Sequence, residues 1–131
     1  MTAAHTLSKR ERLCSMKLTD RLFSGAGSHS MAAFPIRVVW MEKECDGQEP
    51  PVQILVSVSK RHFKHAVKRN RVKRQLREAY RKEKQLLYDK LEATPQRGIM
   101  LAFIWLANEL YPSAEVADRM KKLLQRIAEK L

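Results

Sequence analysis

The chain has 131 residues, which fits one domain able to bury about two-thirds of the surface that its unfolded form exposes. Its 44% hydrophobic and 31% charged residues are typical of a soluble globular domain and argue against a disordered tail or a membrane protein. With 26 Lys and Arg against 14 Asp and Glu, the net charge is +12, so we expect a polyanionic partner, most often a nucleic acid.

The start of the chain lacks a basic segment followed by an apolar one, so no secretory signal is predicted. The longest apolar run, residues 99–107, is too short to cross a bilayer. Cys14 and Cys45 have no zinc-ligand spacing, and we predict free thiols in a cytoplasmic, reducing compartment. We expect residues 1–11 to form a flexible tail and residues 12–131 to form a single domain.

The first predicted elements are a helix and two strands. A short helix is expected at residues 15–24, before Gly25. Residues 34–41 and 52–58 alternate with the period of two that half-buried strands show, and we expect these strands to form a hairpin. Because Pro35 cannot donate to a ladder, its strand should lie at a sheet edge or begin there.

A long helix, a strand and a last helix follow. The long helix is predicted at residues 64–92, before Pro95. Residues 99–107 are apolar on both faces, which suits a short strand that is covered on both sides. The last helix should begin near Ser113, a plausible N-cap, with Glu115 in its first turn. The predicted order α-β-β-α-β-α is an α+β fold in which three helices pack on a small mixed sheet.

Most of the charge lies in residues 60–84, which contain 12 Lys and Arg and two acids. At 100° per residue, one side of the predicted helix is apolar, and the opposite side carries a row about 16 Å long. The apolar side holds Val72, Leu76, Ala79, Tyr80 and Leu87, and the row holds Asn70, Arg74, Arg77 and Arg81. The row matches two or three successive phosphates. A solvated charged face is the alternative, but such faces usually mix signs, and this row has almost no acid to pair with.

A second group of cations lies where the strand leads into the helix. Free backbone N–H groups and the helix dipole favour a phosphate there, so we predict a second contact surface at Lys60, Arg61, Lys64 and Lys68. Arg69 projects toward the apolar side if the helix is regular at that point, so it must extend back to solvent or precede the first regular turn. We interpret His62 and His65 as RNA contacts or bystanders.

The segment from Lys68 to Arg81, KRNRVKRQLREAYR, resembles the RNR signature of the protein subunit of bacterial ribonuclease P. The preceding Ser57-Val-Ser-Lys-Arg61 fits the same pattern, and the order of elements agrees over about residues 12–128. The resemblance implies a sheet with helices and an uncommon left-handed βαβ crossover. It also implies a protein that binds one catalytic RNA and the 5′ leader of precursor tRNA, as the accessory subunit of an endoribonuclease. In this family the RNA, with Mg²⁺ that it mainly holds itself, cleaves the phosphodiester bond.

The resemblance also assigns contact residues. Arg69, Asn70, Arg71, Lys73, Arg74 and Arg77 match the signature and are implied to touch the catalytic RNA, and we add Arg81 from the row. The family's leader groove lies between the sheet and the first helix, where Phe23 matches an aromatic position. Phe34 and Arg37, expected on opposite faces of one strand, are placed nearby, because unpaired RNA favours aromatic stacking over a cationic floor.

Two other RNA- or DNA-binding classes and a protein enzyme are the alternatives. A ribosomal or other structural RNA-binding protein has the same composition. A basic leucine zipper does not fit, because the leucines miss the heptad spacing and Pro95 ends the helix too early. For an enzyme, Asp20, Asp89 and Asp118 are isolated at helical surface positions, so we predict no catalytic or metal-binding residue.

Overall fold

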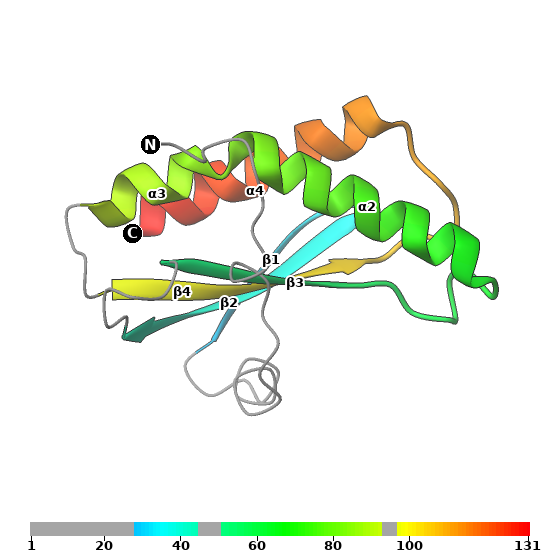
Figure 1. The fold of residues 1–131 in the computed structure, drawn as a ribbon, viewed down its shortest axis with the longest axis horizontal. Helices are drawn as coiled ribbons and strands as arrows, with labels where there is room; N and C mark the ends of the chain where they lie inside the picture. Colours follow the sequence, from blue (N-terminus) through cyan, green and yellow to red (C-terminus); the bar gives the residue numbers. More distant parts are fainter. Residues whose placement is uncertain (1–27, 45–50, 93–96) are drawn as a thin grey trace.

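A computed structural model describes residues 28–44, 51–92 and 97–131 of the chain. One mixed sheet of four strands in the order β1-β2-β4-β3 contains β1 (His29–Ala33), β2 (Ile36–Glu44), β3 (Val52–Ser57) and β4 (Arg97–Trp105). The helices α2 (Ala66–Glu83), α3 (Gln85–Glu92) and α4 (Ser113–Lys130) cover one face of this sheet (Figure 1). The α+β architecture is confirmed. The predicted helix at residues 15–24, the tail at 1–11 and both cysteines lie outside the described residues.

The predicted hairpin between the strands now named β2 and β3 is wrong. β4 lies between them and pairs antiparallel with β2 and parallel with β3. The hairpin partner of β2 is β1, and Phe34 and Pro35 form the turn, with a cis bond between them. A period of two identifies a strand but not its neighbours, and β1 itself gives no clear alternation because its residues are exposed or half-buried throughout. We expected the strand that contains Pro35 to lie at a sheet edge or to begin at this residue. β2 begins directly after Pro35 and lies inside the sheet, so the second alternative is correct.

The side chains of β4 are buried on both faces of the sheet, as its apolar run predicted. Its residues Ile99, Leu101, Phe103 and Trp105 belong to the main core under the helices. Met100 and Ala102 alternate with them and join Val39 and Met41 in a smaller cluster on the opposite face. Both tryptophans, Trp40 and Trp105, are buried core residues. A strand with neighbours at both edges and cover on both faces needs this continuous apolar sequence.

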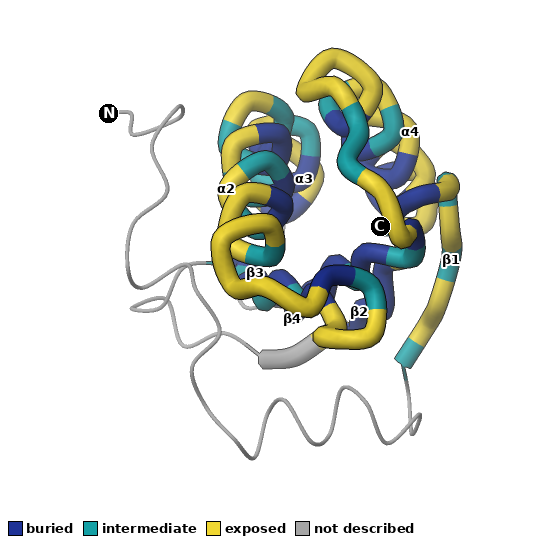
Figure 2. Tube along the Cα trace, turned by 90° about the vertical axis from the view of Figure 1, so that its right-hand side faces the viewer, coloured by how far each residue is buried: buried dark blue, intermediate teal, exposed yellow. Residues whose placement is uncertain are grey.

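The connection from β3 to β4 has an uncommon hand. The chain leaves β3, runs back through α2 and α3 above the sheet and returns as β4, a parallel neighbour of β3. Figures 1 and 2 together show that this path is left-handed, as the resemblance implied and against the general preference for right-handed crossovers. Both α2 and α4 therefore begin at the end of the sheet where β3 and β4 finish (Figure 1).

The predicted helix at residues 64–92 is two helices. It begins at Ala66, because the preceding residues form a turn in which His62 N–H donates to the Ser59 carbonyl at 3.0 Å. Lys84 separates α2 from α3, and its carbonyl accepts hydrogen bonds from the N–H groups of Leu87 and Tyr88. The sequence around Lys84 consists of good helix formers and gives no signal for this break. The apolar side predicted for the helix is buried, as expected.

The last helix, α4, begins at Ser113, but the N-cap position belongs to Pro112 rather than to Ser113. The Pro112 carbonyl accepts hydrogen bonds from the N–H groups of Glu115 and Val116, so the serine hydroxyl is free for a different contact described below. The predicted apolar repeat of α4 is buried, and the helix lies beside α2 and above β1 and β2 (Figure 2). Within the described residues, no helix is long and apolar enough to span a membrane.

Candidate nucleic-acid interface

The solvent side of α2 carries the predicted row. Val72, Leu76 and Tyr80 face the core and are fully buried. On the opposite side Asn70 and Arg74 are exposed, whereas Arg77 and Arg81 are half-buried. Because burial fixes the rotation of the helix about its axis, the apolar stripe determines which cations point outward.

The expectation that this row has almost no acid to pair with is wrong for Arg81. Arg81 forms an ion pair with Glu78, one turn earlier. The hydrogen bond from Arg81 lowers the pKa of the Glu78 carboxyl, and the same bond raises the pKa of Arg81. Arg74 has no hydrogen bond or ion pair among the described residues. A phosphate that binds Arg81 must therefore compete with Glu78, whereas a phosphate that binds Arg74 need not displace an internal partner.

The cationic surface of α2 is broader than the predicted row. Lys68 and Arg71 are also exposed, and Lys73 is half-buried beside the row. At 100° per residue, the positions from Asn70 round to Lys68 cover about 160° of the helix circumference. The described α2 can thus present cations to nucleic acid over nearly half of its circumference.

The loop at residues 58–65 holds the second group of cations at the start of α2. Lys60, Arg61 and Lys64 are exposed there. The Ser59 hydroxyl accepts a hydrogen bond from the Arg61 N–H at 3.1 Å, which shapes the loop. The first turn of α2 has no acidic residue and no side-chain cap, so its N–H groups and these cations together make the positive end of the helix. This geometry agrees with the second contact surface that the sequence predicted, although RNA contact itself remains a prediction.

A further hydrogen bond joins this loop to the loop that follows β4. It links His62 Nδ1 and Asn108 Oδ1 at 2.6 Å, and His62 is half-buried. The carboxyl ends of β3 and β4 are neighbours in a parallel pair, which brings these two loops together. His62 therefore has a structural role in the described chain, and His65 is exposed at the N-cap position of α2.

The sequence left two possibilities for Arg69, which had to extend back to solvent or precede the first regular turn of the helix, and the structure shows the first. The helix is regular at this position, and the guanidinium folds back to solvent-side carbonyls instead of entering the core. Its Nη1 donates to the carbonyl oxygens of Phe63 and Lys64, both at 2.9 Å. Arg69 therefore ties the loop at residues 58–65 to α2 and positions Lys64.

The structure separates two residues that were predicted near the leader groove. Arg37 is exposed on the face of the sheet that carries Val39 and Met41, opposite the helices, and its Nε donates to the Ser30 hydroxyl at 3.0 Å. Phe34 lies in the β1–β2 turn and not in the strand, so its predicted place on one face of β2 is wrong, because Pro35 delays the start of the strand. Phe23 lies outside the described residues.

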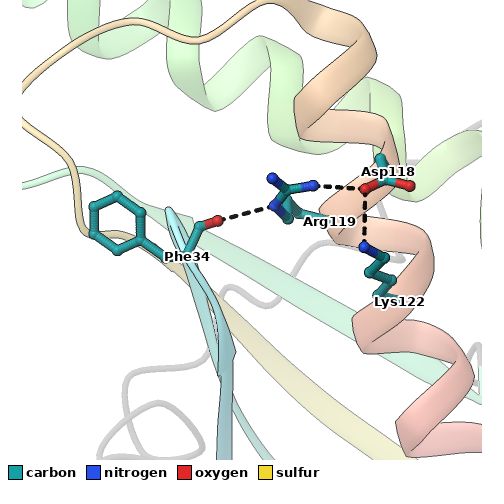
Figure 3. Close-up of polar contacts among 4 residues, drawn as sticks. All are labelled: Phe34, Asp118, Arg119 and Lys122. Atoms are coloured by element: carbon teal, nitrogen blue, oxygen red, sulfur yellow. Dashed lines mark hydrogen bonds and ion pairs between the residues drawn. The ribbon is translucent and has the colours of Figure 1, made fainter.

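Sequence reasoning missed the contacts that attach the helices to this end of the sheet. Gln75 Nε2 donates to the Tyr111 carbonyl at 3.0 Å and to the Ser113 hydroxyl at 3.1 Å, which ties α2 to the start of α4. Arg119 Nε donates to the Phe34 carbonyl at 3.1 Å and its Nη1 binds the Asp118 carboxylate (Figure 3). These pairs are far apart in sequence, and no local pattern could have indicated them.

Asp118 is not isolated, contrary to expectation. Lys122 and Arg119 both contact its carboxylate, and the hydrogen bond from Lys122, with a lesser one from Arg119, lowers the pKa of Asp118. Asp89 also has a partner, because its Oδ1 accepts a hydrogen bond from Gln85 Nε2 at 2.8 Å. Among residues 28–44, 51–92 and 97–131, no three His, Cys, Asp or Glu side chains come together as a group that could hold a metal ion.

Comparisons with known proteins agree with the RNR signature. A family model described as Ribonuclease P matches residues 7–128. The ribonuclease P protein component of Porphyromonas gingivalis is 40% identical over 126 residues, which cover 96% of this chain and 89% of that protein. The component of Chlorobium phaeobacteroides is 38% identical over 129 residues, with 94% and 88% of the two chains covered.

Solved structures show the same fold. The ribonuclease P protein from Thermotoga maritima superposes with a TM-score of 0.65 at 20% identity, over 88% of this chain and 96% of that one. The protein from Staphylococcus aureus gives a TM-score of 0.60 at 19% identity, over 91% and 95% of the two chains. On the family match and the two relatives, the chain belongs to the ribonuclease P protein family.

Proposed function

We propose that this chain binds the RNA subunit of ribonuclease P, one protein per RNA, and with it removes the 5′ leader of precursor tRNA in the cytoplasm. The observation that carries the proposal is the cationic surface of α2, which the buried stripe turns to solvent within the RNR signature. Arginine forks and lysine ammonium groups suit phosphate oxygens, and their joint charge supplies affinity for an RNA backbone.

The Lys and Arg side chains of this surface are suited to phosphate binding and not to metal ligation. Mg²⁺ requires oxygen ligands in octahedral geometry, whereas Lys and Arg are donors without an acceptor site. We therefore assign the Mg²⁺ to the RNA, where it would supply an activated water and neutralise developing charge. The chain's own residues neutralise phosphates and orient the RNA.

This division of labour determines when the protein matters most. Two RNA molecules repel each other through their phosphates, and either Mg²⁺ or protein cations can reduce that repulsion. When Mg²⁺ is abundant, the metal alone is sufficient. The protein should therefore stimulate cleavage most strongly at low Mg²⁺.

The leader of the precursor is proposed to lie along the face of the sheet that carries Arg37. That side chain is exposed on the face whose apolar cluster includes the half-buried Leu55 and Ile104, so a cation and accessible apolar side chains lie on one face. Unpaired RNA uses such combinations of charge and apolar contact. Phe23 supplies the aromatic contact in this proposal.

The test is reconstitution of leader removal. The purified full chain is added to a bacterial ribonuclease P RNA and a precursor tRNA at low Mg²⁺, with the RNA alone and the protein alone as controls. We expect leader removal from the mixture and none from the protein alone. A basic ribosomal protein of similar charge serves as a second control and should not restore cleavage. Absence of any stimulation by this chain, or equal stimulation by the ribosomal protein, would contradict the proposal.

A further inference from the structure

An exposed aromatic ring lies at the end of the sheet where α2 and α4 begin. The Phe34 side chain is 58% exposed, and Val67 is the other large apolar side chain that is exposed among the described residues. The Phe34 ring meets the Tyr111 ring edge-on at 6.4 Å, and Tyr111 meets the buried Trp105 in the same way at 5.6 Å. Phe34 is thus the outer member of a row of three rings that continues into the core.

The backbone on which these rings stand is fixed. The Phe34 carbonyl accepts a hydrogen bond from Arg119, and the Pro35 carbonyl accepts one from the Leu106 N–H at 2.8 Å. The Tyr111 carbonyl is held by Gln75 of α2. Figure 3 shows the Phe34 ring pointing away from Arg119 and α4. A ring that is already positioned loses little conformational freedom when a ligand stacks on it.

The same end of the sheet is rich in cations. Ile36 pairs with Trp105 and Ser57 pairs with Ile104, so the Phe34 turn and the loop at residues 58–65 emerge at one end, on either side of β4. The strands next to them, β2 and β3, lie two spacings of about 4.8 Å apart, which is roughly 10 Å. That loop exposes Lys60, Arg61 and Lys64.

Three acids also lie on the neighbouring segments. Glu109 is exposed in the loop after β4, and Glu115 is exposed in the first turn of α4. Asp118 is held by Arg119 and Lys122. Three exposed cations and a flat apolar ring therefore share this end of the sheet with two acids that have no such pair of cations among the described residues, and the ligand that suits the cations and the ring is an anion with a flat apolar face. A nucleotide has this combination, because the phosphate carries the charge and the base has a π-face.

We propose that Phe34, supported edge-on by Tyr111, forms a stacking platform for one unpaired base of the RNA subunit, with nearby phosphates on Lys60 and Arg61. The platform rests on the proposed function and adds a contact outside α2 and outside the leader face. Its occupant is the RNA subunit rather than the leader, because the Phe34 ring packs on Tyr111, in the segment that leads into α4, while Arg37 lies on the face opposite the helices. Gln75 also joins the platform to α2, so one RNA can reach both surfaces.

The experiment measures the affinity of the full chain for ribonuclease P RNA at fixed salt. Phe34→Ala should weaken binding about 5- to 100-fold, as expected for the loss of one stacked base. Phe34→Trp should retain the affinity, since its ring also stacks. The slope of log K against log salt should not change for Phe34→Ala, because a ring neutralises no phosphate. Gln125→Ala is the control, because this uncharged side chain is exposed in the later part of α4, away from both the platform and α2, and it should bind as the wild type does.

The remaining outcomes separate the platform from the proposed function. If Phe34→Ala reduces the melting temperature, Phe34→Leu replaces it as the test. Leucine keeps an apolar contact with Tyr111 but has no π-face, so this variant must show the same loss of affinity. Unchanged affinity in a folded Phe34→Ala or Phe34→Leu variant overturns the platform alone, provided the wild type binds. A loss confined to precursor tRNA with a long leader also overturns it, since the occupant is then the leader. A wild-type chain that does not bind ribonuclease P RNA overturns the proposed function and the platform with it.

Discussion

Replacement of Leu76 by alanine should destabilise the domain without changing a nucleotide contact. Leu76 has no exposed surface and lies in the buried stripe of α2 between Val72 and Tyr80. Loss of its three outer carbons removes about 2.4 kcal/mol of transfer free energy at about 0.8 kcal/mol per carbon, and the cavity left behind brings the total to about 2–5 kcal/mol. With an unfolding entropy of about 2.1 cal/mol/K per residue, a chain of this length should lose about 7–18 °C in melting temperature.

The assay combines thermal unfolding with RNA affinity well below the melting temperature. Leu76→Ala should bind ribonuclease P RNA within about twofold of the wild type, because the side chain faces away from solvent. Arg74→Ala is the matched comparison from the same helix, and it should show the reverse behaviour. Its stability should stay within about 0.5 kcal/mol, whereas the loss of a charged hydrogen bond should weaken RNA binding by about 1.5–3 kcal/mol. A Leu76 variant with unchanged melting temperature and weakened RNA binding would refute the assignment of the two sides of α2.

Three further changes test separate parts of the site. Arg69→Ala should lower stability by about 1–3 kcal/mol, measured by urea unfolding, because it leaves the Phe63 and Lys64 carbonyls without their donor. Arg69→Lys should restore less than half of that loss, since an ammonium lacks the guanidinium fork. His65→Ala and Asp89→Ala should each leave the maximal cleavage rate of the reconstituted particle within about threefold, far from the roughly 10²-fold loss expected for a general acid or base, and RNA-free nuclease activity that depends on either side chain would contradict this. Phe23→Ala should weaken binding of precursor tRNA with a long leader but not of mature tRNA, and an equal loss for both substrates would show that the ring belongs to the core.

The sequence predicted well those features that short periodicities determine. The burial of Val72, Leu76 and Tyr80 followed from helical spacing, and the double-sided burial of β4 followed from its unbroken apolar run. Strand neighbours were not predictable in this way. β2 and β3 alternate in the same manner, and nothing local shows that a strand from residues 97–105 separates them. The left-handed crossover came from family resemblance alone, since general chirality favours the opposite hand.

In the candidate site, too, local sequence patterns predicted the exposure of side chains but not the contacts between distant residues. Exposure of Arg74 was predictable because a charged residue directly opposite a core stripe faces water. The hydrogen bonds of Arg69 within the chain were predictable only in part. A helical wheel places this residue on the apolar side, so its side chain had to turn away from the core, but the wheel does not identify its acceptors. The position of Phe34 was not predictable, because it depends on the Pro35 turn and on a hydrogen bond from Arg119, 85 residues away along the chain.

The central claim is that the cationic surface of α2 binds an RNA backbone, and the salt dependence of ribonuclease P RNA binding tests it most directly. Each neutralised phosphate contributes about 0.7 to 0.9 to the slope of log K against log salt. We predict a wild-type slope that corresponds to several phosphates, and a slope smaller by about one such increment for Arg74→Ala, with Gln125→Ala unchanged. A wild-type slope near zero, or an Arg74→Ala slope equal to that of the wild type, would contradict the account.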